Sequence, residues 1–287
     1  MKVSEVLREA IHRLQEEGIA EPLPDASLLM AKALNTTRPR LLLHYEDPIS
    51  ETDLAIFHSL IERRVKREPV QYILERWGFM DFELEVGPGA LVPRHETEDW
   101  LERLFAMVEK KLPSRFRAAD IGTGTGAIGI AVGRRFPEST GILCDLSGEA
   151  LLWAKKNTYQ FPEVGTRYRL VKCNLLDCIR SSSIDLLVSN PPYIDKNEIP
   201  KLMPEVAEYE PKIALDGGPD GLAAFSKLLA DAGRVLRTGG ILAMEHGAGQ
   251  RKRILGLPSP GLNLLEAGSD LSGNERYVVF EKIEDRR

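Results

Sequence analysis

Cysteine is scarce in this chain of 287 residues, which has only three: Cys144, Cys173 and Cys178. Their number is odd and no two are spaced as Cys-x-x-Cys, so the sequence supports neither a disulfide framework nor a zinc ribbon. We interpret all three as reduced core cysteines, which are usual in cytoplasmic proteins. No other residues have the spacing of metal ligands, and no bound metal is expected.

Long hydrophobic segments and an excess of positive charge are also missing. No uncharged apolar run approaches the roughly 20 residues of a membrane-spanning helix. The charged start of the chain, Met1 to Gly18, has no apolar core of the kind found in signal peptides. Lys and Arg number 38 against 43 Asp and Glu, which gives a net charge of −5. Proteins that grip a nucleic-acid backbone usually carry a basic excess, so we expect no direct binding of nucleic acid. Because no signal segment or membrane span is visible, we expect a cytoplasmic protein that binds no membrane. We take it to be a monomer.

What the first part of the chain does have is helical periodicity. Apolar residues at three- and four-residue spacing predict an amphipathic helix ended by Gly18; they are Val3, Val6, Leu7, Ala10, Ile11 and Leu14. Similar patterns continue to about residue 72. We assign residues 1–75 to a small helical domain that positions a substrate. Its densest basic cluster, Arg63, Arg64, Lys66 and Arg67, is interleaved with acids and is interpreted as a solvated helix face.

The pattern then changes twice. Apolar residues alternate with polar ones from Trp77 to Val86, and Gly87-Pro-Gly89 follows as a turn, so residues 76–95 are interpreted as a β-hairpin linker. From residue 96 onward, and most clearly from 115, strand and helix patterns alternate, which predicts a parallel sheet with helices on both faces. The predicted strands cover 117–121, 141–145, 168–173, 184–189, 240–245, 263–267 and 276–282. The fold class is therefore α/β, with a Rossmann-like seven-stranded sheet over 96–287.

A glycine-rich loop follows the first strand of this sheet. It comprises Asp120, Ile121, Gly122, Thr123, Gly124, Thr125 and Gly126. Glycines allow tight turns and close approach to a ligand, and the following helix N-terminus favours a carboxylate or phosphate. A G-x-G-x-x-G pattern at Gly124, Gly126 and Gly129 would also fit a nicotinamide dinucleotide. Asp145 ends the next strand, and its two acceptor oxygens match the vicinal hydroxyls of a ribose.

Asn190-Pro191-Pro192-Tyr193 follows the apolar strand at 184–189, at the ligand-binding edge of such a sheet. Two prolines stiffen the loop. The Asn190 oxygen and the Pro191 carbonyl could accept both N–H bonds of a planar NH2 group, and this would favour pyramidalisation of its nitrogen as a methyl group arrives. The Tyr193 ring could pack against the substrate or a cationic sulfonium. These residues predict an NH2 methyltransferase.

With these motifs the chain resembles the class I methyltransferases, most closely the HemK/PrmC family of release factor glutamine methyltransferases. Other segments carry the same resemblance over nearly the whole chain: Glu68 to Ile73, Leu91 to Glu98, Tyr209 to Pro211, Glu245 to Gly247, and the group Asp270, Gly273 and Arg276. The resemblance implies a methyltransferase sheet with a helical N-terminal domain. It also implies methylation, by S-adenosylmethionine, of the glutamine amide nitrogen in the Gly-Gly-Gln loop of release factors.

The resemblance also implies residue roles. The Gly122–Gly126 loop, with Asp120, would hold the methionine part of the cofactor, Asp145 the ribose, and Asn174 with Leu175 the adenine. Asn190 to Tyr193, with Pro93 and Arg94 of the Pro-Arg signature, would hold the glutamine. Two positions depart from the family pattern. Asn174 stands where Asp is usual, and we expect weaker cofactor binding; His95 stands where Pro is common, and we interpret it as a tolerated loop residue.

Three other functions fit parts of the sequence. Adenine-N6 methylation of DNA or RNA would use the same Asn190 chemistry, but the acidic pI and the lack of a target-recognition insert disfavour it. A nicotinamide-dependent oxidoreductase rests only on Gly124, Gly126 and Gly129 and leaves Asn190 to Tyr193 unexplained. A non-catalytic cofactor-binding module would predict that Asn190→Ala has no functional consequence.

Overall fold

The structure is a computed structural model, and it describes residues 1–284. The chain divides into two compact units. The first comprises Met1–Trp77 with Met203–Tyr209, and we call it the helical unit. The second comprises Gly78–Leu202 with Glu210–Arg287, and we call it the α/β unit. Each is described in turn.

The helical unit has a core made by the predicted apolar stripes. The first helix, α1 (Val3–Glu16), buries Val3, Val6, Leu7, Ala10 and Leu14, as its spacing predicts. Both α1 and α4 (Glu51–Val65) pack against α2 (Pro22–Ala33). The Ser50 hydroxyl caps α4 by accepting a hydrogen bond from the Asp53 N–H. The remaining elements are α3 (Arg38–Leu41), η1 (Leu42–His44), α5 (Val70–Leu74) and α10 (Pro204–Ala207).

The basic cluster on α4 is not the solvated face that its charge pattern indicates. The guanidinium of Arg64 is buried, donating to Asp25 Oδ2 and to Glu205 Oε1, each at 2.7 Å. Arg67 donates to the other Glu205 oxygen, also at 2.7 Å. A buried charge needs such partners, and Glu205 lies 141 residues from Arg64 in the sequence. The solvated-face interpretation was wrong for Arg64 because local sequence does not reveal a distant acid.

A β-hairpin is present, but its turn lies elsewhere than predicted. β1 (Arg76–Phe79) pairs with β2 (Phe82–Glu85), and Met80 in the two-residue turn has a φ of +53°. The segment Gly87 to Arg94 forms no strand. The sequence did carry a signal for this turn, because the apolar positions change from odd to even numbers between Phe79 and Phe82.

The α/β unit contains the predicted seven-stranded sheet, in the order β5-β4-β3-β6-β7-β9-β8. Strands β5 to β7 of this order run parallel, whereas β9 is antiparallel to both its neighbours. Ile121 of β3 is in register with Cys144 of β4 and Ser189 of β6, so three strand ends meet at one edge. The strands are β3 (Arg117–Ile121), β4 (Thr140–Asp145), β5 (Tyr168–Lys172), β6 (Ile184–Ser189), β7 (Leu236–Glu245), β8 (Leu262–Ser269) and β9 (Glu275–Lys282).

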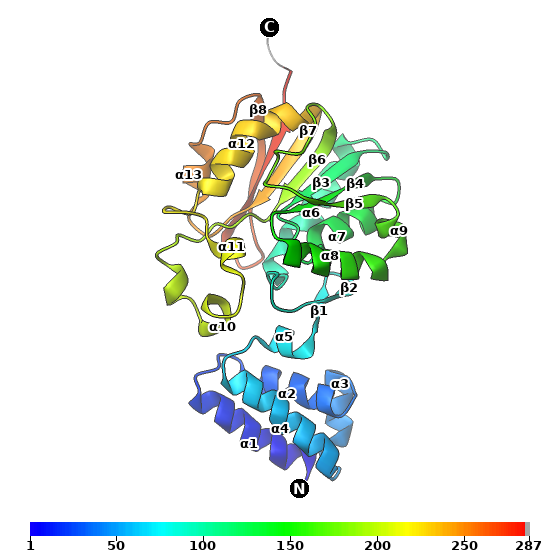
Figure 1. The fold of residues 1–287 in the computed structure, drawn as a ribbon, viewed down its shortest axis with the longest axis vertical. Coiled ribbons are helices and arrows are strands. Elements are labelled where there is room, and N and C mark those ends of the chain that lie inside the picture. Colours follow the sequence, from blue (N-terminus) through cyan, green and yellow to red (C-terminus); the bar gives the residue numbers. More distant parts are fainter. Residues whose placement is uncertain (285–287) are drawn as a thin grey trace. The chain divides into compact units, whose positions relative to one another are not determined.

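Helices cover both faces of this sheet, as predicted (Figure 1). Phe225 and Leu228 of α12 pack against Ala119 and Leu187 on one face. On the opposite face α7 lies so close that a Cβ on its Gly129 would come within 1.9 Å of Leu143. The helices are α6 (His95–Lys111), α7 (Ala127–Arg135), α8 (Gly148–Gln160), α9 (Pro162–Gly165), η2 (Ile199–Lys201), α11 (Lys212–Leu215), α12 (Ala223–Val235) and α13 (Arg251–Leu255).

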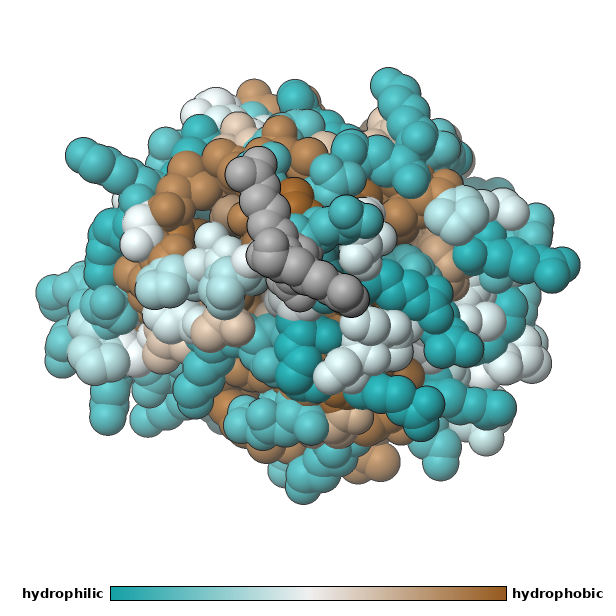
Figure 2. All heavy atoms as spheres, turned by 90° about the horizontal axis from the view of Figure 1, so that it is seen from above, coloured by the Kyte–Doolittle hydropathy of each residue, from teal (hydrophilic) through white to brown (hydrophobic). Residues whose placement is uncertain are grey.

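Apolar and polar residues are interspersed on the face of the molecule shown in Figure 2. Exposed large apolar side chains such as Leu43, Leu152 and Leu271 lie far apart in the sequence, and single exposed residues of this kind are normal. Within residues 1–284, no helix combines the length and the apolar character that a membrane crossing requires.

Candidate active site

A cavity of about 260 Å³ lies at the edge where β3, β4 and β6 end. Seven of the predicted site residues line it: Gly122, Gly124, Asp145, Asn174, Leu175, Asn190 and Pro192. A smaller cavity shares Gly122, Gly124 and Asn190 with it and adds Pro93, Arg94, Thr123 and Thr125. The structure therefore brings most of the predicted cofactor and substrate residues together. Asp120, Gly126, Pro191 and Tyr193 line neither cavity.

The glycine loop needs its glycines for conformation. Gly122, Gly124 and Gly126 have φ values of +71°, +56° and +89°, a region that strains other residues. The N–H groups of Gly122 and Thr123 donate to the Cys144 carbonyl, which ties the loop to β4. Gly126 precedes the first residue of α7. The loop therefore places backbone N–H groups at a helix N-terminus, where partial positive charge favours an anionic group.

Asp120 supports this loop from behind. Its Oδ2 accepts hydrogen bonds from Thr123 Oγ1 at 2.6 Å and from the Gly129 N–H at 2.9 Å. Its Oδ1 is buried and has no hydrogen-bond partner among residues 1–284. Burial raises the pKa of Asp120 to about 7. An acceptor without a partner beside the loop is suited to a donor group on a bound ligand.

Asp145 presents its carboxylate to the main cavity. Oδ2 accepts from the Gly124 N–H at 2.9 Å and Oδ1 from the Ser147 N–H at 2.8 Å. Burial raises the pKa of this carboxyl, while both backbone hydrogen bonds oppose the shift. Each oxygen keeps a further lone pair. The carboxylate is thus fixed in place and can still accept from two hydroxyls of a ligand.

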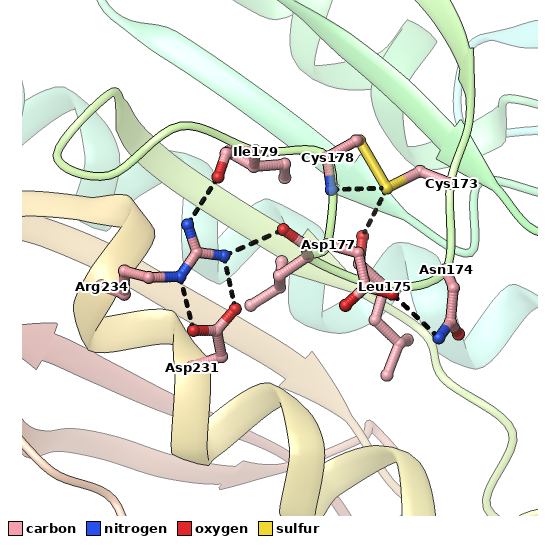
Figure 3. Close-up of a disulfide and its surroundings, with 9 residues drawn as sticks. Cys173, Asn174, Leu175, Asp177, Cys178, Ile179, Asp231 and Arg234 are labelled. Carbon is pink, nitrogen blue, oxygen red and sulfur yellow. Dashed lines mark hydrogen bonds and ion pairs between the residues drawn. A yellow bond between two sulfur atoms is a disulfide. The ribbon is translucent and has the colours of Figure 1, made fainter.

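The far end of the cavity is formed by the loop after β5, shown in Figure 3. The expectation that all cysteines are reduced was wrong here, because Cys173 and Cys178 form a disulfide with their Cα atoms 6.0 Å apart. The odd cysteine count concealed this pair, since Cys144 alone stays free and buried. Leu175, with a φ of +47°, turns the chain back between the two cysteines.

Two further contacts hold the same loop. Arg234 of α12 donates to the carbonyl oxygens of Ile179 at 2.6 Å and Leu176 at 3.0 Å, and is itself paired with Asp231 (Figure 3). The Asn174 Nδ2 donates to Asp177 at 3.1 Å. With its NH2 group engaged in this way, Asn174 leaves its amide oxygen as an acceptor for a ligand.

The Asn190 loop is anchored on several sides. Asn190 Nδ2 lies 3.4 Å from Thr97 Oγ1, and the Thr97 hydroxyl donates to Glu245 Oε2 at 2.6 Å. The Tyr193 carbonyl accepts from Gln250 at 2.8 Å. Burial raises the pKa of the Tyr193 hydroxyl to about 12, so it stays protonated. Pro191 is buried.

Arg94 and His95 begin α6. Arg94 is its N-cap and donates to the buried Glu210 at 2.5 Å. The interpretation of His95 as a loop residue was wrong, because it is the first residue of α6, with Nδ1 2.7 Å from Glu98. The first helical position favours proline, which accounts for the usual family residue at this place.

Several residues at the site have no role that the sequence predicts. Thr97 and Glu245 stood inside motifs quoted for the family resemblance, but nothing in those motifs showed that they meet. The cavity wall also includes Ala90, Leu91, Pro211, Ile213, Ala214 and Lys227. No local pattern marks these wall residues, since their place depends on the chain returning to the sheet edge.

The sheet order, the glycine loop and the cavity at the strand ends define an α/β protein of the class I methyltransferase type. The catalytic domain of hMettl16, solved in complex with a MAT2A 3′UTR hairpin, shares this fold, with a TM-score of 0.50, 18% identity, and 71% of this chain and 76% of that chain covered. The PrmC N-terminal domain family matches residues 5–74, and the methyltransferase small domain family matches residues 102–208.

Two curated relatives are similar over nearly their full length. The release factor glutamine methyltransferase of Agrobacterium fabrum is 36% identical over 283 residues, covering 98% of this chain and 97% of that protein. The enzyme of the same name from Caulobacter vibrioides is 37% identical over 271 residues, covering 94% and 93%. The chain therefore belongs to the release factor glutamine methyltransferase family. The predicted family and fold class are confirmed, and with them S-adenosylmethionine as the cofactor of the class.

Proposed function

We propose that this protein transfers a methyl group from S-adenosylmethionine to the side-chain amide nitrogen of the glutamine in the Gly-Gly-Gln loop of peptide chain release factors. The observation that carries the proposal is the position of Asn190, which lines both the main cavity and the smaller one beside Pro93 and Arg94. An amide acceptor at the junction of the two cavities can meet a substrate NH2 group where a cofactor methyl group would arrive.

Successive groups of residues along the main cavity match successive parts of the cofactor. The Gly122–Gly126 loop leads into the N-terminus of α7, whose partial positive charge suits the carboxylate of the methionine part. Asp120 lies behind this loop, and its unpartnered Oδ1 adds negative charge that suits the ammonium group. Asp145 supplies two acceptors for the ribose hydroxyls. Asn174 and Leu175 line the end proposed for adenine, where the Asn174 oxygen can accept from the adenine amino group.

The proposed reaction depends little on general acid–base catalysis. When bound, the cofactor supplies an electrophilic methyl group on a positively charged sulfur; the carbon–sulfur bond breaks as the nitrogen–carbon bond forms, and the nitrogen releases one proton. The Asn190 oxygen and the Pro191 carbonyl would accept the two N–H bonds of the glutamine amide. Both hydrogen bonds strengthen as the nitrogen becomes pyramidal, so they stabilise the transition state more than the ground state.

The remaining predicted residues have supporting roles in this proposal. Arg94, fixed by its ion pair with Glu210, and Pro93 form the wall on the substrate side. The Tyr193 side chain packs against the core beneath the loop, and we assign it the role of holding Asn190 to Pro192 in place. The helical domain at 1–75 is proposed to position the release factor, with 76–95 as a linker. We propose that the protein acts as a monomer in the cytoplasm without directly binding nucleic acid.

Adenine-N6 methylation is the alternative that shares the Asn190 chemistry. The nicotinamide alternative is disfavoured, because it leaves Asn190 to Tyr193 without a role and the chain belongs to a methyltransferase family. A methyl-transfer assay decides between the first two. The protein is incubated with labelled S-adenosylmethionine and either unmodified release factor or unmethylated DNA, with Asn190→Ala as the inactive control. Label in the release factor supports the proposal, whereas label in DNA alone overturns its substrate.

A further inference from the structure

A buried hydrogen-bond network lies behind Asn190. Glu245 ends β7, and its side chain accepts hydrogen bonds from Thr97 Oγ1 at 2.6 Å and from Trp100 Nε1 at 2.8 Å. Thr97, Trp100 and Glu245 are at most 3% exposed. Thr97 also meets Asn190 Nδ2 at 3.4 Å and lines the smaller cavity beside it. The network thus reaches from the sheet to the one side chain on which the proposed chemistry depends.

The number of protons on the Thr97 hydroxyl determines which hydrogen bonds it can make with Asn190. A threonine hydroxyl has one proton, and Thr97 uses it in the hydrogen bond that it donates to Glu245. Towards Asn190 the Thr97 oxygen can therefore act only as an acceptor. The group of Asn190 that faces it must be the NH2 group, since two acceptors would repel each other. The Asn190 oxygen is then turned away from Thr97, free to accept from a substrate.

We propose that Thr97, with its hydroxyl oriented by Glu245, is the positioning residue that fixes the amide orientation of Asn190 for methyl transfer. An asparagine amide can rotate by half a turn with little change in shape, and the reversed form would present N–H donors to the substrate NH2 group. Thr97 disfavours that form. The inference rests on the proposed function, because it assigns Asn190 the part of acceptor for a substrate NH2 group.

Three variants test the role of Thr97. Thr97→Val keeps the shape but removes the acceptor, and Thr97→Ser keeps the hydroxyl. Thr158→Val is the matched control, because Thr158 is also buried and its hydroxyl donates to the Lys155 carbonyl within α8, away from Asn190. For each we would measure kcat on release factor, the Kd for S-adenosylmethionine and the thermal midpoint of unfolding.

The expected result is a kcat for Thr97→Val at least about tenfold below that of the parent protein, as misplacement of a reacting group produces. Its cofactor Kd stays near the parent value, and its thermal midpoint falls by no more than a few degrees, because the buried Glu245 loses one of its two donors. Thr97→Ser restores kcat to within about threefold, and Thr158→Val leaves it unchanged. An unchanged kcat in Thr97→Val overturns the proposal. So does a loss of kcat that is accompanied by equal losses of cofactor binding and thermal stability, because that pattern marks a purely structural role.

A second measurement keeps this test separate from that of the substrate. If the parent protein leaves release factor unmethylated, the proposed function fails, and activity no longer reports on Asn190. The side-chain NH2 signal of Asn190 in a ¹⁵N spectrum, assigned by its loss in Asn190→Ala, then decides. A signal that moves in Thr97→Val but holds its position in Thr97→Ser supports the orientation role. A signal that Thr97→Val leaves unmoved overturns it.

Discussion

The Gly124 N–H donates a 2.9 Å hydrogen bond to the Oδ2 of Asp145, so the loop after β3 and the end of β4 hold each other in place. The loop that would receive one end of a cofactor therefore depends on the carboxylate that would bind its ribose. The position of the glycine loop is therefore coupled to the position of the Asp145 carboxylate.

Replacing Asp145 tests this coupling. Asp145→Asn leaves one acceptor oxygen where the native side chain has two, and its NH2 group must face either the Gly124 or the Ser147 N–H donor. We expect the affinity for S-adenosylmethionine, measured by calorimetry, to fall by about 10- to 100-fold, which corresponds to about 1.4–2.7 kcal/mol. Asp185→Asn, near the opposite end of β6, is the control and should bind normally. Equal affinities in the two variants would argue against the ribose role.

Asp120 predicts a pH dependence of stability. Its pKa is raised from 3.8 to about 7 by burial, so the folded protein holds this proton more tightly than the unfolded chain. Stability is therefore lost as the pH rises from about 4 to 7 and is constant above that. The Asp120→Asn variant has no carboxyl to ionise at this position, so it does not lose stability in this way. The free energy of unfolding of the variant, relative to the parent, should increase by at most about 1.4 kcal/mol per pH unit up to pH 7.

This difference is measured by urea unfolding of both proteins without cofactor at several pH values between 5 and 8. A difference that does not change with pH would show that Asp120 is ionised across the whole range, contrary to the effect of its burial.

The buried Arg64 should matter far more than its neighbour Arg63. Arg64→Met leaves the buried Asp25 without its ion-pair partner and Glu205 with Arg67 alone, which costs about 3–5 kcal/mol. Arg63→Met removes only a partly exposed pair with Glu68, which costs less than about 1 kcal/mol. Urea unfolding followed by circular dichroism provides both values. Similar losses in the two variants would mean that Arg64 is not buried with its acids.

Thiol counting checks the disulfide. Cys144 is buried, and burial raises its pKa to about 12, so the native protein should not react with a thiol reagent. After unfolding without reductant one thiol should react, and after reduction three, because Cys173 and Cys178 are paired. Three reactive thiols without reductant would restore the expectation of reduced cysteines.

The structural features that the sequence predicts correctly are those encoded within short segments. The strands and the positive-φ glycines follow from periodicity and spacing within short windows. The contacts that organise the site join residues far apart in the chain: Arg94 with Glu210 across 116 positions and Thr97 with Glu245 across 148. No periodicity specifies such pairs, because they depend on which strand ends become neighbours in the sheet. The turn at Met80 was missed because a non-glycine residue adopts the left-handed conformation there.

The position of the transferred methyl group decides whether this protein methylates the release factor glutamine. Release factor is incubated with S-adenosylmethionine and the parent protein, Thr158→Val or Asn190→Ala, then digested and analysed by mass spectrometry. The account predicts one added methyl group, on the side-chain nitrogen of the Gly-Gly-Gln glutamine, with the parent and Thr158→Val and none with Asn190→Ala. A methyl group on another residue, or full methylation of that glutamine by Asn190→Ala, would contradict it.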